Sequence, residues 1–421
     1  MKILQINKFF YRRGGSEAYF FDLIRLLEKH GHEVIHFSVN HPQNFDSPYR
    51  EFFINEINFE KREGLVKDSK KFSHSLYSLE AKNKLEKLIL KTKPEIAHLH
   101  NVSHHISPSI FRVLRKYKIP VVQTLHDYQL ICPNFKMFTE GAICERCKKY
   151  RYWNAVIHKC VHDSRLESFA QCLEMYFHGA CQFYENGVYY FVTPSKFLKD
   201  KLEEWGAAKT KKQRNGETEK QKLSVVHIPH FLDVINYTPK YEPGEYALYF
   251  GRLVKEKGLD SLLEAVNGTE IKLKIVGDGP EKDKLKLQVA SYKLQEKIEF
   301  IDYKSGKELR DLIRGSKFAV LPSIWYENYP MSLLEAGALG RAAVGSKLGG
   351  IGEIIEEGVN GFLAAPGDAD DLREKMRRLW SDDDLCERMG QRAREIVSER
   401  NSPEEHYKKI MELYGGLVSR I

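Results

Sequence analysis

Two glutamates in the second half of the chain have a spacing that suits recognition of one extended ligand. Glu327 and Glu335 lie in the segment Pro322-Ser-Ile-Trp-Tyr-Glu-Asn-Tyr-Pro-Met-Ser-Leu-Leu-Glu335, where an apolar strand ends and Pro330 fits the first turn of a helix. Glu327 would precede this helix, and Glu335 would lie about a turn and a half inside it. Two carboxylates placed in this way can accept hydrogen bonds from hydroxyl groups in different parts of a ligand. The alternative is that both are ordinary surface charges.

The same region offers groups that suit a phosphorylated ligand. Gly251-Arg-Leu-Val-Lys-Glu-Lys-Gly258 directly follows an expected strand, and Arg252 and Lys257 would place two fixed positive charges there, as binding of a diphosphate requires. Backbone amides at the start of the helix could donate to phosphate or sugar oxygens, namely those of Tyr329, Met331 and Ser332. A plain surface turn that carries two cations is the alternative.

Glycine-rich loops at three other expected strand ends would let the backbone approach a ligand closely. Gly277-Asp-Gly-Pro280 falls short of the full dinucleotide-binding fingerprint, so it is a weak signal by itself. Lys347-Leu-Gly-Gly-Ile-Gly-Glu353 follows the strand expected at Ala342–Ser346. Gly14-Gly15 lies between the first strand and the first helix, where the helix N-terminus could receive an anion.

Histidines follow two expected strands of the first half. Ile96-Ala-His-Leu-His100 ends one strand, and Thr124-Leu-His-Asp-Tyr128 ends the next, which places His126 and Asp127 at a strand end. Three histidines at two strand ends could indicate a metal site. Imidazoles in such places more often hydrogen-bond within the protein, and this alternative is the preferred one.

Seven cysteines without a recognisable secretion signal favour a metal site or free thiols over disulfides. Four of them form the pattern C-x11-C-x2-C-x12-C, which predicts a structural zinc site that orders an otherwise aperiodic insert: Cys132, Cys144, Cys147 and Cys160. Thiols that are free or paired with each other are the alternative. The remaining three are expected to be buried hydrophobic side chains: Cys172, Cys181 and Cys386.

Basic and aromatic residues alternate around this insert. They are Arg146, Lys148, Lys149, Tyr150, Arg151, Tyr152, Trp153 and Lys159. The combination suits a membrane interface or an anionic glycan, and it suits nucleic acid equally well. A solvated rim of the cysteine insert is the plain alternative.

Alternation of strands and helices predicts the elements that position these groups. The first run of expected strands is Lys2–Ile6, Glu33–Ser38, Ile96–Leu99, Pro120–Leu125, Tyr189–Thr193 and Ser224–Ile228. The second run is Tyr246–Phe250, Lys272–Val276, Ile298–Ile301, Phe318–Leu321 and Ala342–Ser346. Short apolar strands alternating with helices predict an α/β protein with two doubly wound parallel sheets. Ligands of such sheets bind at the carboxyl ends of the strands, which predicts a cleft formed by the loops described above.

Length and composition agree with two globular domains. The 421 residues are 42% hydrophobic and 29% charged, which excludes collagen, coiled coil and wholesale disorder. No apolar run approaches the roughly 18 residues that span a bilayer, and the first residues are typical of a strand, so a cytoplasmic protein is expected. Residues 1–240 hold 38 Lys and Arg against 26 Asp and Glu, whereas residues 241–421 hold 28 against 32. The basic first half suggests an anionic partner, which could be lipid headgroups on the inner face of a membrane, an anionic glycan or a phosphorylated acceptor, whereas nucleic acid is not expected. A lysine-rich solvated surface is the plain alternative.

The order of the motifs resembles the retaining family 4 glycosyltransferases, which have the two-domain GT-B fold. The motifs are GRxxxxKG, GxGP, E-x7-E and GG-x2-E, and the resemblance runs from Gly14-Gly15 to about Leu372. It implies that Arg252 and Lys257 hold the diphosphate of a nucleotide-sugar donor, a UDP- or GDP-sugar. It also implies that Glu327 binds the hydroxyls of the donor sugar and Glu335 the ribose, with Asp302-Tyr303 near the base.

The resemblance assigns roles in the first half too. It implies that the Gly14-Gly15 loop closes over the donor phosphate and the acceptor, and that His126 faces the reacting centre with Asp127 beside it. It favours front-face attack, in which the leaving phosphate accepts the proton of the acceptor, so no catalytic metal is expected. Two positions depart from the family pattern, because Gly352 replaces a usual proline, which would loosen its loop, and His230 replaces a usual asparagine.

The expected catalytic residues are His126, Glu327, Arg252 and Lys257. The expected donor-binding residues are Gly14, Gly15, Asp127, Arg252, Lys257, Gly277, Tyr303, Glu327, Asn328, Tyr329, Met331, Ser332 and Glu335. The expected domains are an acceptor-side domain over residues 1–233, with a cysteine-rich insert at about 130–162, and a donor domain over 234–402, with helix 403–421 completing the first domain. The segment 233–244 is the best candidate for a linker, and 209–222 is expected to be a surface loop.

The predicted function is transfer of a sugar to a glycan or lipid-linked acceptor in cell-surface polysaccharide or glycolipid synthesis. Two alternatives are an NAD-dependent dehydrogenase, although the full glycine fingerprint is missing, and a nucleic-acid-binding protein with a cysteine module.

Overall fold

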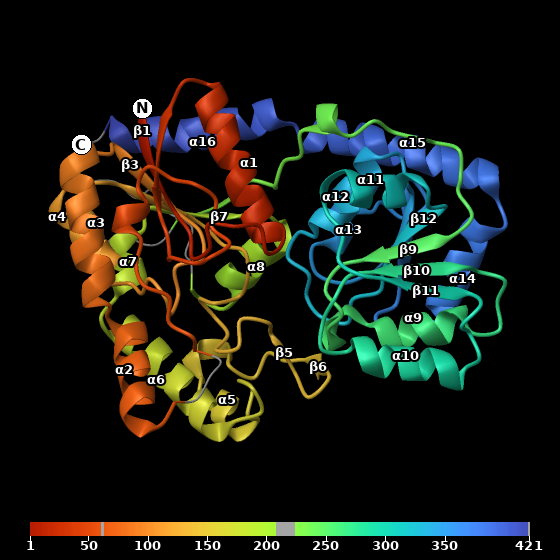
Figure 1. Cartoon of the computed structure of the whole chain (residues 1–421), viewed down its shortest axis with the longest axis horizontal. Coiled ribbons are helices and arrows are strands. Elements are labelled where there is room, and N and C mark those ends of the chain that lie inside the picture. Colours follow the sequence, from red (N-terminus) through yellow and green to blue (C-terminus); the bar gives the residue numbers. More distant parts are fainter. Residues whose placement is uncertain (60–62, 208–223, 420–421) are drawn as a thin grey trace. The chain divides into compact units, whose positions relative to one another are not determined.

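The computed structural model describes residues 1–59, 63–207 and 224–419, so the surface loop expected at 209–222 lies outside the described residues. The chain divides into two compact units. Unit 1 comprises Met1–Met137, Cys144–Ile228 and His406–Ile421, and unit 2 comprises Phe138–Ile143 and Pro229–Glu405. Each unit contains one parallel sheet flanked by helices (Figure 1).

The sheet of unit 1 has six parallel strands in the order β2-β1-β3-β4-β7-β8. The strands are β1 (Lys2–Ile6), β2 (Glu33–Phe37), β3 (Ile96–Leu99), β4 (Val121–Thr124), β7 (Tyr190–Thr193) and β8 (Ser224–His227). The helices are α1 (Gly15–Lys29), α2 (Leu65–Leu76), α3 (Leu79–Thr92), α4 (Ile110–Lys116), α5 (Asn154–Ile157), α6 (Arg165–Ala180), α7 (Phe183–Gly187) and α8 (Lys196–Glu204). The late helix α16 (Pro403–Val418) contributes its residues from His406 onward to the same unit, and it runs beside β1 and α1 (Figure 1).

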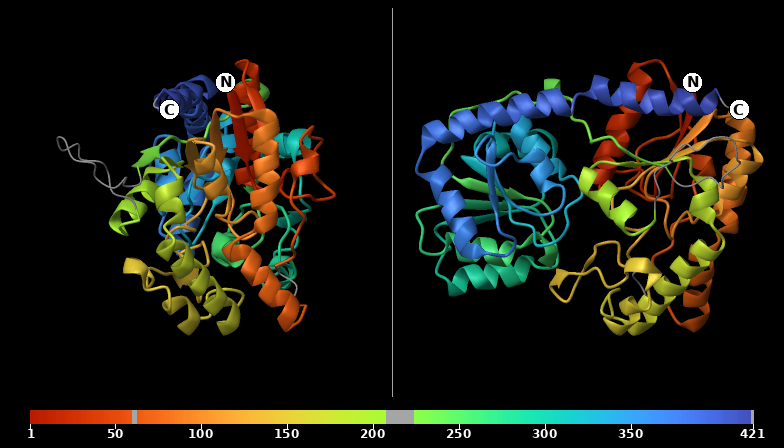
Figure 2. Two further views of the ribbon diagram at one scale, coloured as in Figure 1. Left: turned by 90° about the vertical axis from the view of Figure 1, so that its left-hand side faces the viewer. Right: turned by 180° about the vertical axis from the view of Figure 1, so that it is seen from behind.

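The sheet of unit 2 also has six parallel strands, in the order β11-β10-β9-β12-β13-β14. The strands are β9 (Ala247–Phe250), β10 (Leu273–Val276), β11 (Ile298–Ile301), β12 (Phe318–Leu321), β13 (Ala343–Ser346) and β14 (Gly361–Ala364). The helices are α9 (Leu259–Val266), α10 (Lys282–Ser291), α11 (Gly306–Arg314), α12 (Met331–Ala338), α13 (Ile351–Ile354), α14 (Ala369–Trp380) and α15 (Asp383–Arg400). Helices lie on both faces of each sheet (Figure 2).

The predicted fold class is confirmed, because every expected strand is present with its ends within one residue of the prediction. The sequence pattern missed β14, which is only four residues long and begins at Gly361. A Cβ atom at that position would lie 2.1 Å from the carbonyl oxygen of Ala343, so only glycine lets the two strands pair. A residue that usually indicates a turn is therefore required inside this sheet.

The segment expected to be a linker is packed onto unit 2. Arg341, which is 1% exposed, donates to the carbonyl oxygens of Glu242 at 2.9 Å and Lys240. Arg394 donates in the same way to Tyr237 at 3.0 Å and Val234 at 3.1 Å. Two arginines thus satisfy the backbone carbonyls of a segment that has no strand partner.

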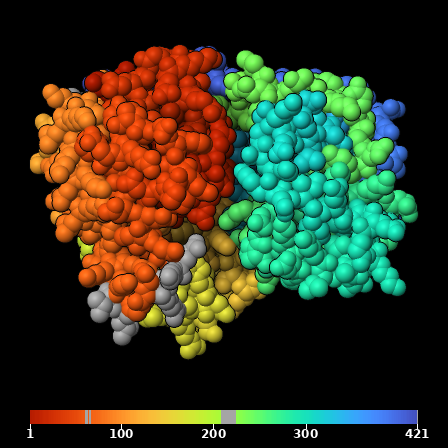
Figure 3. Space-filling model, in the orientation of Figure 1, coloured from red at the N-terminus to blue at the C-terminus, as the bar shows by residue number. Residues whose placement is uncertain are grey.

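The cysteine insert is short in regular structure, and its residues Phe138–Ile143 belong to unit 2. The pair β5 (Phe138–Thr139) and β6 (Ala142–Ile143) forms a small antiparallel hairpin, and α5 packs against α6. In the space-filling view, the face of unit 1 turned to the viewer is built mostly from the N-terminal part of the chain, drawn red to orange (Figure 3). Over the described ranges, no helix has the length and apolar character that crossing a bilayer requires.

Candidate active site

The carboxylate of Glu327 is the most firmly held group among the predicted site residues. Its Oε1 accepts hydrogen bonds from Lys257 Nζ at 2.6 Å, Ser323 Oγ at 2.5 Å and Trp325 Nε1 at 2.9 Å. Glu327 is 5% exposed, and the ammonium of Lys257 also lies 5.7 Å from the centre of the Trp325 ring. Because three donors meet on one oxygen, the carboxylate has a fixed orientation.

The second oxygen of this carboxylate is the one that a ligand can reach. Oε2 of Glu327 has no hydrogen bond to any described residue, and it does not belong to the buried atoms that lack a partner. It is therefore open to solvent. The geometry leaves one fixed acceptor oxygen at the carboxyl end of β12, beside a cation.

Close backbone contacts shape the loops around this carboxylate. The amide of Gly350 donates to the carbonyl of Glu327 at 2.7 Å, and Gly349 has a φ of 61°. A Cβ atom at Gly349 would lie 2.4 Å from the same carbonyl, so the glycine-rich loop after β13 can approach Glu327 only without a side chain. The loops after β9 and β10 make a similar contact, since a Cβ atom at Gly277 would lie 1.9 Å from the carbonyl oxygen of Gly251.

The remaining donor-site predictions of unit 2 lie along the same carboxyl ends of strands. Glu335 in α12 accepts a long hydrogen bond from Tyr237 Oη, 3.4 Å, and Tyr329 Oη accepts one from Asn401 at 3.0 Å. Burial raises the pKa of Tyr329 to about 12. Arg252 is exposed after β9, and Tyr303 is 62% exposed after β11.

Three further positions follow from where α12 begins. The helix starts at Met331 with Pro330 at the N-cap, so the amides of Met331 and Ser332 belong to the first turn, which lacks intrahelical acceptors. Asn328 just before it is buried. The interpretation of Gly352 as a loosened loop is wrong, because Gly352 lies inside the short helix α13, and its φ is not in the left-handed region.

His230, the other departure from the family pattern, is buried at 4% exposure. Its carbonyl accepts a hydrogen bond from Asn401 Nδ2 at 2.6 Å, and its ring lies 6.1 Å from that of Tyr329. His230 is thus part of the packing that holds Tyr329 at the start of α12.

His126 in unit 1 belongs to a chain of buried polar side chains. Its Nε2 lies 3.1 Å from Nδ1 of His100, whose Nε2 lies 2.9 Å from Oε1 of Gln5 on β1. Burial lowers the pKa of His126 to about 3, so the imidazole is neutral near pH 7. A neutral imidazole can exchange donor and acceptor roles with a bound hydroxyl, whereas an imidazolium could only donate.

The same network extends to α16. His98 Nδ1 lies 2.5 Å from Tyr414 Oη, and its Nε2 lies 2.7 Å from Thr124 Oγ1. Burial lowers the pKa of His98 to about 3. Tyr19 of α1 lies 3.0 Å from Nε2 of His406. The strand-end histidines therefore hydrogen-bond within the protein, as preferred from the sequence.

Asp127 follows β4, and the paired glycines lie between β1 and α1 of the same unit. Burial raises the pKa of Asp127 to about 6, against the hydrogen bond that its Oδ1 accepts from the amide of Gln129 at 2.9 Å. Gly14 is the N-cap of α1 and Gly15 its first residue. Glu17 in the first turn is 5% exposed, and burial raises its pKa.

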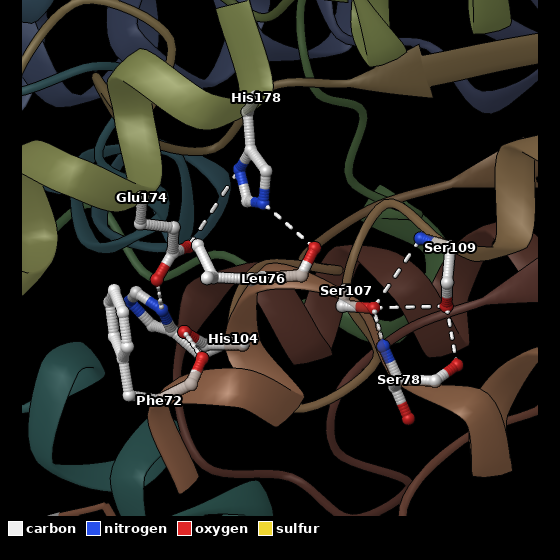
Figure 4. Close-up of polar contacts among 9 residues, drawn as sticks. Phe72, Leu76, Ser78, His104, Ser107, Ser109, Glu174 and His178 are labelled. Carbon is white, nitrogen blue, oxygen red and sulfur yellow. Dashed lines mark hydrogen bonds and ion pairs between the residues drawn. The ribbon is translucent and has the colours of Figure 1, made fainter. Parts of the chain in front are cut away.

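A second buried carboxylate in unit 1, Glu174, is paired with two histidines (Figure 4). Its Oε2 lies 3.0 Å from His104 Nδ1, and its Oε1 lies 3.9 Å from His178 Nδ1. Burial acts to raise the pKa of Glu174, but the two histidines and Ser75 outweigh it, so the pKa is lowered. Glu174 lies on α6 and His104 in the loop after β3, so this cluster joins the two elements.

The four cysteines of the predicted zinc site are neighbours in unit 1. Burial raises the pKa of the Cys147 thiol, and the thiols of Cys132, Cys144 and Cys160 raise it further. Throughout the described part of the chain, however, no group of three or more His, Cys, Asp or Glu side chains is arranged to hold a metal ion. The zinc hypothesis gains no support from the structure. Cys181, expected to be buried, is exposed.

Sequence patterns missed the residues that support the site rather than form it. Ser323 and Trp325 orient Glu327, and Gln5 and Tyr19 lie next to the histidine network. Only Trp325 carried a signal, because a tryptophan two residues from a buried acid has a single N–H that needs an acceptor. The contact between Lys257 and Glu327 joins residues 70 positions apart, which no local pattern indicates.

Two family models match successive parts of the chain. Residues 13–214 match the model described as Glycosyltransferase Family 4, and residues 234–396 match the model described as Glycosyl transferases group 1. The chain belongs to the family 4 glycosyltransferases. Family membership selects the glycosyltransferase hypothesis over the dehydrogenase and nucleic-acid-binding hypotheses.

Proteins of similar sequence align with nearly all or with part of this glycosyltransferase. N-acetyl-alpha-D-glucosaminyl L-malate synthase of Bacillus anthracis is 23% identical over 404 residues, 95% of this chain and 93% of that one. An uncharacterized glycosyltransferase of Methanocaldococcus jannaschii is 31% identical over 164 residues, but these make up 38% of this chain and 46% of the relative. A glycosyltransferase of Salmonella typhimurium named for colanic acid biosynthesis is 31% identical over 159 residues, 35% of this chain and 39% of that one.

Solved structures show the GT-B fold. Sucrose-phosphate synthase of Thermosynechococcus elongatus aligns over 100% of both chains with a TM-score of 0.70 and 17% identity. The protein HepE of Anabaena, solved in complex with UDP and glucose, aligns over 99% of this chain and 100% of its own with a TM-score of 0.66 and 16% identity. The glycosyltransferase described above therefore has two Rossmann-like domains in the GT-B arrangement of elements.

Proposed function

We propose that this glycosyltransferase is a retaining enzyme that moves a sugar from a UDP- or GDP-sugar to a glycan or lipid-linked acceptor in the synthesis of a cell-surface polysaccharide or glycolipid. The observation that carries the proposal is the fixed carboxylate of Glu327 beside Lys257. One accessible acceptor oxygen suits the hydroxyls of a donor sugar, and the adjacent cation suits its diphosphate. The UDP found in the HepE complex supports a nucleotide-sugar donor. The colanic acid name of the Salmonella relative supports a role in polysaccharide synthesis.

In the proposed reaction, an oxygen of the acceptor forms a bond to the anomeric carbon on the face from which the nucleoside diphosphate departs. The bond from that carbon to the diphosphate oxygen breaks, and the diphosphate keeps the electron pair. The leaving diphosphate also takes the proton of the acceptor hydroxyl. The configuration of the anomeric carbon is retained, and no covalent enzyme intermediate forms.

Positive charge stabilises the leaving group in this scheme. Lys257 uses one of its three N–H groups toward Glu327, and the other two can reach diphosphate oxygens together with the Arg252 guanidinium. Amides of Met331 and Ser332 at the start of α12 add donors without charge. Because two side-chain cations serve the diphosphate, we expect transfer without a divalent cation. Activity lost in EDTA and restored only by Mg²⁺ or Mn²⁺ contradicts this part.

Four other side chains complete the proposed donor site. Glu335 binds the ribose, and Tyr303 lies beside the base. His126 faces the transferred sugar as a neutral imidazole, with Asp127 beside it. The Gly14-Gly15 turn approaches the donor phosphate at the start of α1.

The decisive experiment measures sugar transfer and donor hydrolysis across a panel of UDP- and GDP-sugars. At least one donor should be turned over, and NMR of the product should show the anomeric configuration of the donor. Glu327→Gln should lower kcat by about 10² to 10³ while the protein still folds cooperatively, since the amide keeps the shape of the side chain but loses the charge that pairs with Lys257. Glu299→Gln on the exposed edge of β11 is the matched control and should keep full activity. A Glu327→Gln variant with full activity refutes the proposed site.

We also propose a membrane contact through α5 and α6. The outward face of α6 carries large apolar side chains, with Leu166 65% exposed and Phe169 49% exposed, and Ile157 of α5 is 60% exposed. Exposed Lys159 and Arg165 adjoin them, and basic residues around apolar ones suit anionic lipid headgroups. The protein should sediment with vesicles that contain phosphatidylglycerol, and the pair Leu166→Ser and Phe169→Ser should abolish this. Leu287→Ser, which removes a leucine of α10 that is 74% exposed, is the control.

Structural zinc at Cys132, Cys144, Cys147 and Cys160 stays a prediction from their spacing. Elemental analysis of freshly purified, reduced protein tests it. About one zinc ion per chain is expected, and protein without zinc shows that the thiols serve another purpose.

A further inference from the structure

A pocket in unit 1 adjoins the strand end that carries His126 and Asp127. Its volume is about 360 Å³, within the range of small-molecule sites. Its walls come from α6, α7, the loop after β4 and the segment around Tyr150. Gln129 lines it, and the amide of Gln129 donates to Oδ1 of Asp127 at 2.9 Å. One wall of the pocket is thus anchored to Asp127.

Polar atoms without partners point to a ligand in this pocket. Gln129 is 7% exposed, yet neither Nε2 nor Oε1 of its side chain has a hydrogen-bond partner among the described residues. Oε2 of Glu185, on the α7 wall, is buried and lacks a partner in the same part of the chain. Buried amide and carboxylate atoms nearly always have hydrogen-bond partners in folded proteins. These three atoms therefore indicate a ligand that supplies hydroxyl or amide groups as partners.

Tyrosine rings form the other side of the pocket. The ring centres of Tyr150 and Tyr152 lie 6.2 Å apart, and those of Tyr152 and Tyr176 lie 5.2 Å apart. Tyr176 Oη donates to the carbonyl of Tyr150 at 2.9 Å, and Tyr150 Oη donates to the carbonyl of Gly206 at 3.2 Å. The hydroxyls of Tyr150 and Tyr176 are thus bonded to the backbone, which fixes these two rings and leaves apolar ring surface toward the pocket.

The charges of the pocket exclude an anionic ligand. The described residues that line it include Glu174 and Glu185 but no lysine or arginine. Glu174 is already paired with His104 and His178 (Figure 4), so it offers a phosphate nothing but repulsion. An acyl chain fits no better, because it would leave both amide atoms of Gln129 unpaired.

We propose that this pocket binds a neutral sugar ring of the acceptor. The apolar face of the ring stacks on the tyrosines, and its hydroxyls pair with Gln129 and Glu185. This inference rests on the proposed function, since it gives the acceptor a subsite next to the strand end expected to face the reacting centre. It also names the acceptor's chemistry at this position, which is an uncharged saccharide and not the phosphate of a lipid carrier.

Direct binding tests the proposal without knowledge of the natural acceptor. The probes are the methyl glycosides of glucose, galactose and N-acetylglucosamine, measured by saturation-transfer NMR, with cis-parinaric acid as a probe of acyl chains and UDP as a probe of the donor site. At least one glycoside should bind at millimolar concentration. Gln129→Leu should weaken that binding by about tenfold or more, because leucine keeps the volume but offers no hydrogen bond.

Stability separates a binding role of Gln129 from a structural one. Gln129→Leu removes two unpaired buried atoms, so its unfolding temperature should equal or exceed that of the parent protein. Gln288→Leu is the matched control, since Gln288 on α10 of unit 2 also has a buried oxygen without a partner. It should leave glycoside binding unchanged.

Each outcome bears on one proposal or the other. Glycoside binding that Gln129→Leu does not weaken, or cis-parinaric acid binding in place of the glycosides, overturns the sugar pocket. UDP binding without any glycoside binding overturns it too and leaves the proposed function standing. Glycoside binding that depends on Gln129, together with failure to bind UDP and GDP and to turn over any UDP- or GDP-sugar, leaves the pocket standing as a sugar site and refutes the proposed function.

Discussion

The two six-stranded sheets of this glycosyltransferase bury different chemistry under the same parallel pairing. Strands of unit 1 carry Gln5, His98 and Gln123 at positions with no exposure, each within the hydrogen-bonded network that reaches His126 and α16. The central strands of unit 2, Ala247–Phe250 and Phe318–Leu321, bury only apolar and aromatic side chains. Buried polar side chains thus lie on the central strands of unit 1, whereas the two central strands of unit 2 carry none and its buried polar groups lie elsewhere, as Arg341 does.

The largest expected consequence of this difference is acid sensitivity confined to unit 1. Fifteen of the sixteen histidines lie there, and burial lowers the pKa of His98 and His126 to about 3 and that of His36 to about 4. The unfolded chain takes up these protons near pH 6.5 and the folded unit does not. Stability is therefore complete above pH 6.5 and should fall by up to about 1.4 kcal/mol per pH unit for each histidine as the pH drops toward 4.

Hydrogen exchange measured from pH 7 to 4.5 checks this prediction. Amides of β3 and β4 should lose protection as the pH falls, while those of β9 and β12 should not. Asp127 acts in the opposite direction, because its pKa of about 6 favours the folded state as it becomes protonated. Glu17, whose pKa burial also raises, acts in the same direction as Asp127. The buried histidines outnumber these two carboxyl groups, so equal loss of protection in both sheets would show that the histidines do not set the acid limit.

A smaller effect should follow from removing one hydroxyl in each unit. Tyr414→Phe leaves His98 Nδ1 without its partner in the interior and should cost about 1–3 kcal/mol of unfolding free energy. Tyr249→Phe, also fully buried, removes a hydrogen bond to the carbonyl of Arg252, next to solvent, and should cost less. Urea titrations of the two variants give the comparison. If Tyr249→Phe lost more unfolding free energy than Tyr414→Phe, the buried hydrogen bonds would not distinguish unit 1 from unit 2.

The smallest effect should be one on activity alone. Trp325→Phe keeps an aromatic ring beside Lys257 but removes one of the three donors to Glu327. We expect kcat/KM to fall by about tenfold with an unchanged unfolding temperature, because the remaining two donors still hold the carboxylate. Trp380→Phe in α14 should change neither quantity. Loss of stability in Trp325→Phe would mean that the polar loops of unit 2 also maintain its fold.

The sequence predicted the strands well because buried parallel strands read as short apolar runs. The sequence pattern did not predict α6, because apolar side chains of this helix are exposed and polar ones are buried. Leu173 and Phe177 of this helix are about 40% exposed, whereas Glu174 and His178 are buried. Apolar periodicity marks the buried face of a helix only when the core beneath it is apolar. Beneath α6 lie His104 and a polar pocket, so the usual rule points the wrong way.

The site was predictable as a set of residues and not as a set of contacts. Glu327 and Lys257 stood out because each follows a strand and each belongs to a recognisable motif. Their ion pair depends on how the loops after β9 and β12 meet, and that depends on close contacts such as those at Gly349 and Gly277. Such contacts are set by backbone geometry across the sheet, which spacing along the chain does not encode.

The late position of α16 has a consequence for how the protein is made. His406 and Tyr414 complete a network whose other members include Tyr19 and His98. Tyr19 is synthesised 387 residues before its partner His406, and His98 is synthesised 316 residues before Tyr414, so both precede all of unit 2. During most of synthesis the interior of unit 1 therefore lacks two of its hydrogen-bonding partners. Nascent or truncated chains that lack α16 should expose this gap to chaperones and proteases, so unit 1 is expected to mature only after α16 has been synthesised.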